Sequence, residues 1–328
     1  MFPEIKSIHF IGICGTAMAA AAAAMQEKGF RVTGSDQNVY PPMSTFLACR
    51  RVEVFSGYAE NNLRHNPDLV VIGNAISRGN AEAEAVLDRR MRYCSLPELL
   101  KEFFIRGKRS VVVTGTHGKT TTTALLTWVF QHNGLNPSYL IGGMPNNLGQ
   151  GACFTDSDWF IIEGDEYDTA FFDKRSKFIH YLPEVAIVNN LEFDHADIFE
   201  DVAAIQTAFR RFINIIPRNG LLLANGDDDN LAPLLEVKHC PVRRFGLGER
   251  CDVRARNVRL EPDASAVHAQ GASLRGPLAG ETTARNAPAV DACPPPCGPP
   301  HPPAHRPRSA RRDHPARRKH RGTGTEGA

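Results

Sequence analysis

The chain has 328 residues, 42% of them hydrophobic, and a formal net charge of +2. This length is enough for two domains with separate cores, and the composition is that of a soluble globular protein. The balance of charges gives no reason to expect nucleic acid as a partner. Because no long apolar run and no basic, apolar leader occurs, we expect no membrane association and a location in the cytoplasm.

The first part of the chain alternates strand-like and helix-like segments. β-Branched and aromatic runs predict strands at 7–13, 30–34 and 69–73. An alanine-rich helical stretch runs from Thr16 to Lys28, and Gly29 is a typical residue for its end. Another helical stretch lies around 81–90. This alternation of strands and helices predicts a Rossmann-like domain over residues 1–107.

A second α/β unit begins after a basic turn at 106–109. Val-rich and Ile-rich runs, with a Leu-rich one, predict buried strands at 110–114, 159–162, 185–188 and 220–223. Helical or loop segments separate these runs, so a mostly parallel sheet is the simplest arrangement. We assign residues 108–287 to this second domain, which gives both domains an α/β fold class.

The strand at 110–114 leads into Gly-Thr-His-Gly-Lys-Thr-Thr, and a helical run at 124–132 follows. A glycine-rich loop between a strand and a helix is the context of a phosphate-binding loop, because backbone N–H groups can surround phosphate oxygens there. Lys119 would supply charge to the β- and γ-phosphates, and the Thr120 hydroxyl would ligate Mg²⁺. We predict ATP binding by Gly115, Thr116, His117, Gly118, Lys119, Thr120 and Thr121.

This loop departs from the general phosphate-loop pattern at one position. The pattern G-x-x-x-x-G-K-[ST] places a glycine where this chain has Val113, so the loop is a variant. The alternative is an ordinary strand-to-helix turn with a chance Gly-Lys-Thr. The strand, the loop and the helix together favour nucleotide binding.

Polar residues follow two of the predicted strands at the point where each strand ends. Glu163 comes directly after the run at 159–162, and a carboxylate there can hold the Mg²⁺ that bridges nucleotide phosphates. His195 follows the next strand and is flanked by Asp194 and Asp197, which favours a ligand of a second metal ion. The alternatives are a solvated acidic loop and a structural histidine.

These segments resemble the Mur ligase family, whose central domain carries GT-x-GKT, E-x-DE and N-x-x-x-DH-x-D motifs in this order. The forms GTHGKTTTT and DH-x-D are similar to the branch of the family that binds UDP-N-acetylmuramate. Three first-domain segments match the same branch, namely GICGTAM (12–18), TGSD (33–36) and NAISRGN (74–80). Three more resemble the branch that recycles murein peptides, namely NVYPPMST (38–45), IGG-x-PNN (141–147) and DEYDTAFFDKRSKFIHY (165–181).

The resemblance implies an ATP-dependent ligase that forms an acyl phosphate. ATP would phosphorylate the lactyl carboxylate of UDP-N-acetylmuramate, and the amine of L-alanyl-γ-D-glutamyl-meso-diaminopimelate, the murein tripeptide, would displace the phosphate. It also implies roles for individual residues. Lys119, His117 and His195 would be catalytic, and Thr120, Glu163 and His195 would hold Mg²⁺.

The same resemblance implies two further groups of binding residues. The UDP-sugar would be bound by Gly12, Gly15, Thr16, Ser35, Asp36, Ser77 and Arg78. The peptide would be bound by a basic loop that contains Lys174, Arg175 and Lys177. The alternatives are a plain core helix for the alanine-rich stretch and a solvated run of charges for the basic loop.

Two features near the end of the chain depart from the family. Its motif G-x-HN-x-x-N has Thr282 and Thr283 in place of His and Asn here, while Asn286 stays in register to bind adenine. Residues 288–328 are rich in Pro and Arg and contain no Leu, Ile, Phe, Met, Trp or Tyr, so we predict a disordered tail. Because nothing resembles the family's third domain, we expect a truncated or frameshifted chain with impaired ligase activity.

Three other functions stay open at this stage. The chain could join L-alanine to UDP-N-acetylmuramate, although the DEYDTAFFDKRSKF segment argues against this reaction. It could also bind a nucleotide without catalysis. A nicotinamide oxidoreductase is disfavoured, because Cys14 and Ala17 replace two glycines of the G-x-G-x-x-G pattern. The sequence does not determine the oligomeric state.

Overall fold

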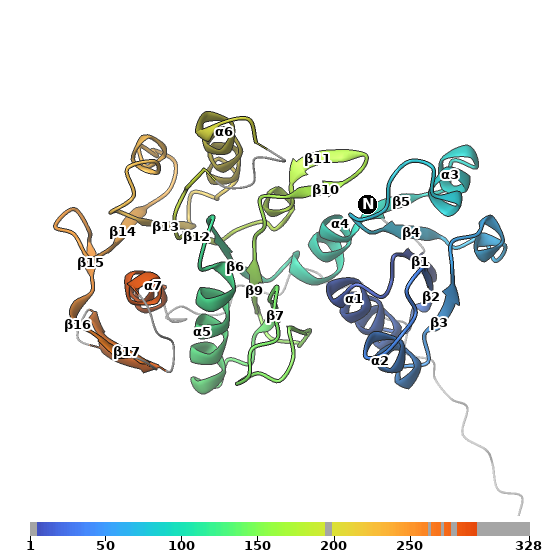
Figure 1. Cartoon of the computed structure of the whole chain (residues 1–328), viewed down its shortest axis with the longest axis horizontal. Helices are drawn as coiled ribbons and strands as arrows, with labels where there is room; N and C mark the ends of the chain where they lie inside the picture. The colour runs from blue at the N-terminus through green and yellow to red at the C-terminus, as the bar shows by residue number, and fades with distance from the viewer. Residues whose placement is uncertain (1–4, 194–198, 262–263, 270–271, 277–280, 294–328) are drawn as a thin grey trace, which may run out of the picture. The chain divides into compact units, whose positions relative to one another are not determined.

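The structure of the protein is a computed structural model that describes residues 5–193, 199–261, 264–269, 272–276 and 281–293. These residues belong to one compact unit. They contain two mainly parallel sheets with helices packed on them (Figure 1). Within this part of the chain, no helix is both long and apolar enough to cross a membrane.

The N-terminal sheet has the strand order β3-β2-β1-β4-β5, and all of its strand pairs are parallel. Its strands are β1 (Ser7–Ile11), β2 (Arg31–Asp36), β3 (Glu53–Ser56), β4 (Leu69–Ile72) and β5 (Tyr93–Ser95). Every side chain of β4 is buried, as expected for a parallel strand that is covered on both faces. The strand order changes direction between β1 and β4, and ligands of such sheets bind beside that point.

Helices and short helical turns connect these strands and follow the last of them. The helices are α1 (Thr16–Glu27), α2 (Met43–Cys49), α3 (Ala81–Asp88) and α4 (Leu96–Leu100), with 3₁₀ and π turns at Glu60–Leu63 and Lys101–Ile105. Gly29 ends α1 with a φ of +91°, and its N–H donates to the Gln26 carbonyl at 3.0 Å. The Phe30 N–H donates to the Met25 carbonyl at 3.2 Å, which completes a Schellman motif. The end predicted for this helix is confirmed.

The second sheet has the strand order β15-β14-β13-β12-β6-β9-β7-β8, and β8 runs antiparallel to β7. Its strands are β6 (Arg109–Thr114), β7 (Ser138–Leu140), β8 (Ala152–Cys153), β9 (Trp159–Glu163), β12 (Val185–Val188), β13 (Leu221–Asn225), β14 (Val242–Gly246) and β15 (Val253–Arg254). Valine and isoleucine side chains of β6, β9 and β12 form the centre of the core. The carboxyl ends of these parallel strands lie at one edge, where the polar segments follow them.

The remaining elements cover or extend this sheet. They are α5 (Lys119–His132), α6 (Val202–Ile213), α7 (Glu281–Ala292), 3₁₀ turns at Lys177–His180 and Ala232–Leu234, the hairpin β10 (Asp168–Ala170) and β11 (Asp173–Ser176), and the antiparallel strands β16 (Arg256–Glu261), β17 (Ala264–Ala269) and β18 (Ala272–Gly276). In Figure 1, α5 lies beside β6 and α7 lies beside α5.

The α/β fold class is confirmed, with differences at two boundaries. The helix after the glycine loop begins at Lys119 rather than at 124. The tail was predicted to begin at 288, whereas α7 continues to Ala292, and Ala289, Val290 and Cys293 are buried in the core of the second sheet. Composition misled here because these small apolar side chains suffice to pack against α5. Residues 294–328 lie outside the described part of the chain.

Candidate active site

The loop between β6 and α5 carries the predicted phosphate-binding residues. Gly115 and Gly118 have φ values of +132° and +77°, which glycine adopts without steric strain. Gly118 immediately precedes α5, so the N–H groups of the loop lie at the positive end of a helix dipole. One face of α5 is buried against the sheet through Thr122, Thr123, Leu126, Thr127 and Phe130. The loop is therefore held on a rigid helix and can bind an anion.

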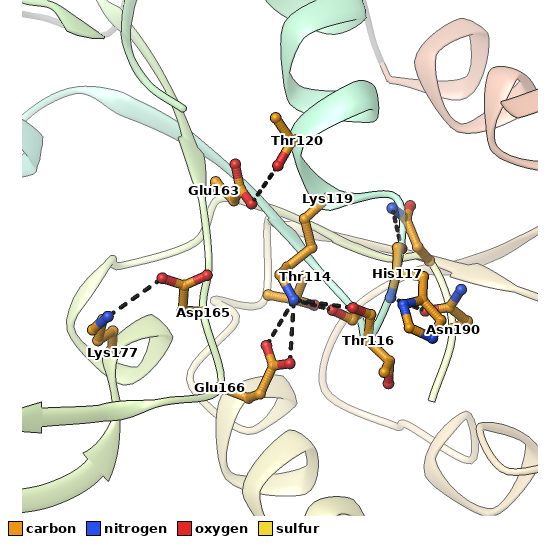
Figure 2. A network of polar contacts seen from close by, with 12 residues as sticks. Thr114, Thr116, His117, Lys119, Thr120, Glu163, Asp165, Glu166, Lys177 and Asn190 are labelled. Carbon is orange, nitrogen blue, oxygen red and sulfur yellow. Dashed lines mark hydrogen bonds and ion pairs between the residues drawn. The ribbon is translucent and has the colours of Figure 1, made fainter. Parts of the chain in front are cut away.

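The Lys119 side chain folds back over this loop (Figure 2). Its Nζ donates to the carbonyl oxygens of Gly115 and Thr116 at 2.7 and 3.2 Å. It also contacts both carboxylate oxygens of Glu166 at 2.9 and 3.2 Å. Glu166 had no role among the residues predicted from the sequence. The signal that could have found it is the last acidic position of the E-x-DE motif.

Glu163 lies at the end of β9 and faces the first turn of α5. Its Oε1 accepts a hydrogen bond from the Thr120 hydroxyl at 2.9 Å, and its Oε2 accepts one from the Gly142 N–H at 2.7 Å. Burial raises the pKa of the Glu163 carboxyl, the Gly142 and Thr120 hydrogen bonds oppose that effect, and nearby Asp165 adds to it. The structure therefore brings together Thr120 and Glu163, two of the three predicted Mg²⁺ ligands.

These residues suit Mg²⁺. A hydroxyl and a carboxylate are the hard oxygen donors that this ion prefers. Glu163 is also a partly buried carboxylate whose charged form is disfavoured by burial, and a bound cation would offset that cost. The donor set and its electrostatics thus fit the predicted ion.

The segment that follows β12 contacts the phosphate loop through two asparagines, Asn189 and Asn190, which were not among the residues predicted from the sequence. The Asn190 side-chain oxygen accepts a hydrogen bond from the His117 N–H at 2.8 Å, and its carbonyl accepts one from the Thr116 N–H at 3.1 Å. The Asn189 side chain donates to the Thr122 hydroxyl at 3.2 Å. Two amides directly after a buried strand were the available signal. They fix the shape of the loop.

The two predicted catalytic histidines differ in what the structure describes. His117 is about half exposed, and its Nε2 lies 3.7 Å from the Glu192 carboxylate. His195 falls within residues 194–198, outside the described part of the chain, so its role as a metal ligand stays a prediction. Among the described residues, no group of three or more His, Cys, Asp or Glu side chains is placed to hold a metal.

A small cavity lies next to the phosphate loop, between α5 and α7. Its volume is about 240 Å³, and its lining includes Gly118, Thr121, Thr122, Leu125, Asn286, Ala287 and Val290. Asn286 is buried. The structure therefore brings the predicted adenine-binding asparagine to the loop that carries the predicted phosphate-binding residues, although the two are far apart in the sequence.

A larger cavity lies beside the N-terminal sheet, where the strand order changes direction. Its volume is about 620 Å³, and its lining includes Gly12, Gly15, Asp36, Tyr58, Asn74, Ser77 and Arg78. Asp36 accepts a hydrogen bond from the Cys14 N–H at 2.9 Å, which shapes the loop after β1. Burial and the Asp36 charge raise the pKa of Tyr58, so this phenol stays a hydrogen-bond donor. A cavity of this size suits a small organic ligand.

Two of the residues predicted to bind the UDP-sugar, Thr16 and Ser35, do not line this cavity. Thr16 lines a third cavity, whereas Ser35 faces away from this one. Its side chain is fully buried and donates to the Glu82 carboxylate at 2.5 Å. Its carbonyl accepts hydrogen bonds from the N–H groups of Gly12 and Ile13 at 2.8 and 3.0 Å. Side chains of β2 alternate between faces, so the Ser35 side chain points away from the cavity. The residue instead holds the loop after β1 through its backbone carbonyl.

A third cavity joins the start of α1 to the second sheet. Its lining includes Gly15, Thr16, Asn74, Gly142, Glu163, Asp165, Lys177 and Tyr181. Lys177, whose Nζ lies 3.4 Å from Asp165, is the predicted peptide-binding residue in this lining. Lys174 and Arg175 are more than half exposed and pair with Asp168 and Asp173 at 2.7 Å. The structure therefore separates Lys177 from the other two basic residues of its segment.

Comparisons with known proteins agree with this geometry. The sequence profile of the Mur ligase middle domain matches residues 113–293, and that of the Mur ligase family catalytic domain matches residues 7–108. The crystal structure of UDP-N-acetylmuramate:L-alanyl-gamma-D-glutamyl-meso-diaminopimelate ligase from Neisseria meningitides superposes with a TM-score of 0.80 at 42% identity. That match covers 88% of this chain and 93% of the other.

Two curated relatives are 50% identical to this chain. Both are named UDP-N-acetylmuramate--L-alanyl-gamma-D-glutamyl-meso-2,6-diaminoheptandioate ligase. The Haemophilus influenzae protein aligns over 233 residues, or 71% of this chain, and the Escherichia coli protein over 258 residues, or 79%. The chain spans 51% and 56% of the lengths of these two relatives. From these matches and from its own loop geometry, the chain belongs to the Mur ligase family.

Proposed function

We propose that this chain takes part in ATP-dependent amide formation between UDP-N-acetylmuramate and L-alanyl-γ-D-glutamyl-meso-diaminopimelate. One observation supports this most directly. One cavity is lined both by Gly15 and Thr16, at the start of α1, and by Glu163, at the end of β9 in the second domain. A sugar nucleotide bound beside α1 can thus extend its carboxylate toward the γ-phosphate of an ATP bound on the 115–120 loop.

The proposed reaction has two steps. A carboxylate oxygen of the muramate attacks the γ-phosphorus, so that ADP leaves and an acyl phosphate forms. The amine of the tripeptide then attacks the acyl carbon, phosphate leaves and the nitrogen loses a proton. Lys119 and the N–H groups of the loop would stabilise the negative charge on the phosphoryl oxygens in both steps.

Thr120 and Glu163 would hold Mg²⁺, which supplies positive charge to the nucleotide phosphates when it is bound. Asn286 would contact the adenine, and Asp36, Ser77 and Arg78 would contact the sugar nucleotide. A location in the cytoplasm and a role in peptidoglycan recycling stay predictions from the sequence.

The decisive experiment supplies the chain with ATP, Mg²⁺, UDP-N-acetylmuramate and the tripeptide. We expect the amide product, detected by mass spectrometry with one ADP per amide, at a rate lowered by the impairment that the sequence predicts. A second reaction replaces the tripeptide with hydroxylamine, which converts an acyl phosphate to a hydroxamate and tests the first step alone. A chain that binds neither ATP nor UDP-N-acetylmuramate by calorimetry, and forms no hydroxamate, contradicts the proposal.

A second candidate substrate is free L-alanine. The observation in its favour is a similarity to a Psychrobacter protein named UDP-N-acetylmuramate--L-alanine ligase. The two sequences are 36% identical over 259 residues, which is 79% of this chain and 52% of that protein. The same assay with L-alanine in place of the tripeptide separates the two. Product from L-alanine alone would select this candidate, and binding without either product would select a non-catalytic nucleotide-binding protein.

A further inference from the structure

Lys119 and Glu166 form a buried ion pair that the proposed reaction does not use. The lysine side chain is 11% exposed and the glutamate side chain 3%. Glu166 lies after β9, near Glu163, but the two carboxylates face different partners, as Figure 2 shows. Burying two charges is costly, and each charge of this pair offsets part of the cost of burying the other.

The acceptors around Lys119 already use the capacity of its ammonium group. A lysine ammonium has three N–H donors. In this structure they are shared among the Gly115 carbonyl, the Thr116 carbonyl and the Glu166 carboxylate. A phosphate oxygen that binds Lys119 must therefore displace one of these acceptors, and it must do so close to the negative charge of Glu166.

We propose that Glu166 is a positioning residue of the nucleotide site, which holds Lys119 against the loop and competes with nucleotide phosphates for its ammonium group. This inference rests on the proposed binding of ATP at the same loop. Its consequence is that the empty loop keeps Lys119 paired and shielded, and that nucleotide affinity is lower than the loop alone would give. Glu163 has the opposite effect, because it attracts the metal ion that accompanies the nucleotide.

Matched substitutions separate these roles. Glu166→Gln and Glu163→Gln each remove one negative charge near the loop, and Glu236→Gln removes one from an exposed position far along the chain. ADP binding is measured by calorimetry with excess EDTA and again with Mg²⁺. In EDTA we expect Glu166→Gln to bind ADP about tenfold more tightly than the wild type. We expect Glu163→Gln to lose the gain in affinity that Mg²⁺ gives the wild type, and Glu236→Gln to match the wild type.

A second measurement follows Lys119 itself without any nucleotide. The proteins are treated with a water-soluble acetylating reagent, and the acetylation of Lys119 is followed by peptide mass spectrometry. We expect Glu166→Gln to make Lys119 react severalfold faster, whereas Glu163→Gln changes its rate much less, because the Glu163 carboxylate bonds Thr120 and Gly142 instead. Glu166→Asp keeps the charge but shortens the side chain, so it should raise the reaction rate with a smaller gain in ADP affinity.

Each result of these two measurements either supports or overturns the inference about Glu166. Unchanged or weaker ADP binding by Glu166→Gln, together with unchanged Lys119 acetylation, overturns the inference. If Glu166→Gln does not fold, as judged by circular dichroism, Glu166→Asp decides the same question, and an unchanged acetylation rate in that variant overturns it. A wild-type chain that binds no ADP contradicts the proposed function, while the acetylation rates still decide whether Glu166 holds Lys119.

Discussion

A Cβ atom on Gly115 would lie only 3.0 Å from the Cβ of Asn189. The backbone of Gly115 also has a φ of +132°, which side chains rarely adopt. The phosphate loop and the segment after β12 are thus packed so closely that glycine alone fits at this position. Close packing of this kind lets Asn189 and Asn190 determine the path of the loop.

The first prediction follows from that contact. Gly115→Ala should lower the free energy of unfolding by at least about 2 kcal/mol, because it adds a steric overlap to an unfavourable φ. Urea unfolding measures the loss, and calorimetry should show that ATP binding is lost as well. Gly134→Ala is the matched control, because Gly134 also has a positive φ of +75° but no atom within 4 Å of the added Cβ. It should cost about 1 kcal/mol and leave ATP binding intact.

The second prediction concerns the pH dependence of stability at Glu163. Burial raises the pKa of Glu163 above the ordinary value of 4.5, so the folded state favours the neutral carboxyl. The stabilisation from this preference is fully present below pH 4.5 and is lost as the pH rises through the raised pKa. Without metal, Glu163→Gln should therefore raise the melting temperature at pH 7 but not at pH 4. Mg²⁺ with ADP should stabilise the wild type more than the variant. Equal melting temperatures at pH 7 would contradict the buried charge.

The third prediction tests the small cavity beside α5. Asn286→Ala should weaken ATP binding about tenfold, because a buried polar partner of the base would be lost. Binding of inorganic tripolyphosphate, which has no base, should not change. Asn133→Ala, at the exposed end of α5, serves as the control and should bind both compounds normally. Equal losses for ATP and tripolyphosphate would place the defect in the loop and not in the cavity.

The fourth prediction concerns Asp173 in the hairpin β10–β11. Its carboxylate accepts two hydrogen bonds from the Arg175 guanidinium at 2.8 and 2.7 Å, and Arg175 holds its pKa at about 2, below the ordinary value of 3.8. The stabilisation is thus present above pH 3.8 and is lost as the pH falls toward 2.

Asp173→Asn should therefore cost roughly 1–2 kcal/mol at pH 7, a modest amount because Arg175 is largely exposed. Urea unfolding at pH 7 and at pH 2 measures the difference, which should be smaller at the lower pH. The control is Asp156→Asn, at an exposed position, which should change stability little at either pH. A loss of equal size at both pH values would show that the charge of Asp173 is not the cause.

Much of this architecture could be predicted because parallel strands bring their carboxyl ends to one edge. The valine-rich and isoleucine-rich runs at 110–114, 159–162 and 185–188 became adjacent strands, so Lys119 and Glu163 had to lie close together. The pairing of Lys119 with Glu166 could not be predicted in the same way. It depends on the turn between β9 and β10 and on the rotamers of two long side chains.

Other features that were not predicted from the sequence have a related cause. Ser35 was assigned to the UDP-sugar together with Asp36 through the TGSD segment, but adjacent residues of a strand point to opposite sides, and only Asp36 lines the cavity. The short strands β3 and β7 carry too few residues for a pattern of alternation to stand out. Asn189 and Asn190 act through contacts with a loop more than 70 residues away in the sequence.

The helix α7 is anchored in the core beside α5 by alanine and valine side chains, and the cysteine that follows it, Cys293, packs there as well. Many different sequences contain such small apolar side chains, so many of them could pack at these positions of α7. A stretch of unrelated ancestry could replace it and still bring one asparagine, Asn286, to the wall of the cavity. Selection on such a segment would act on Asn286 and on the size of the buried side chains. The identities of its other residues could change.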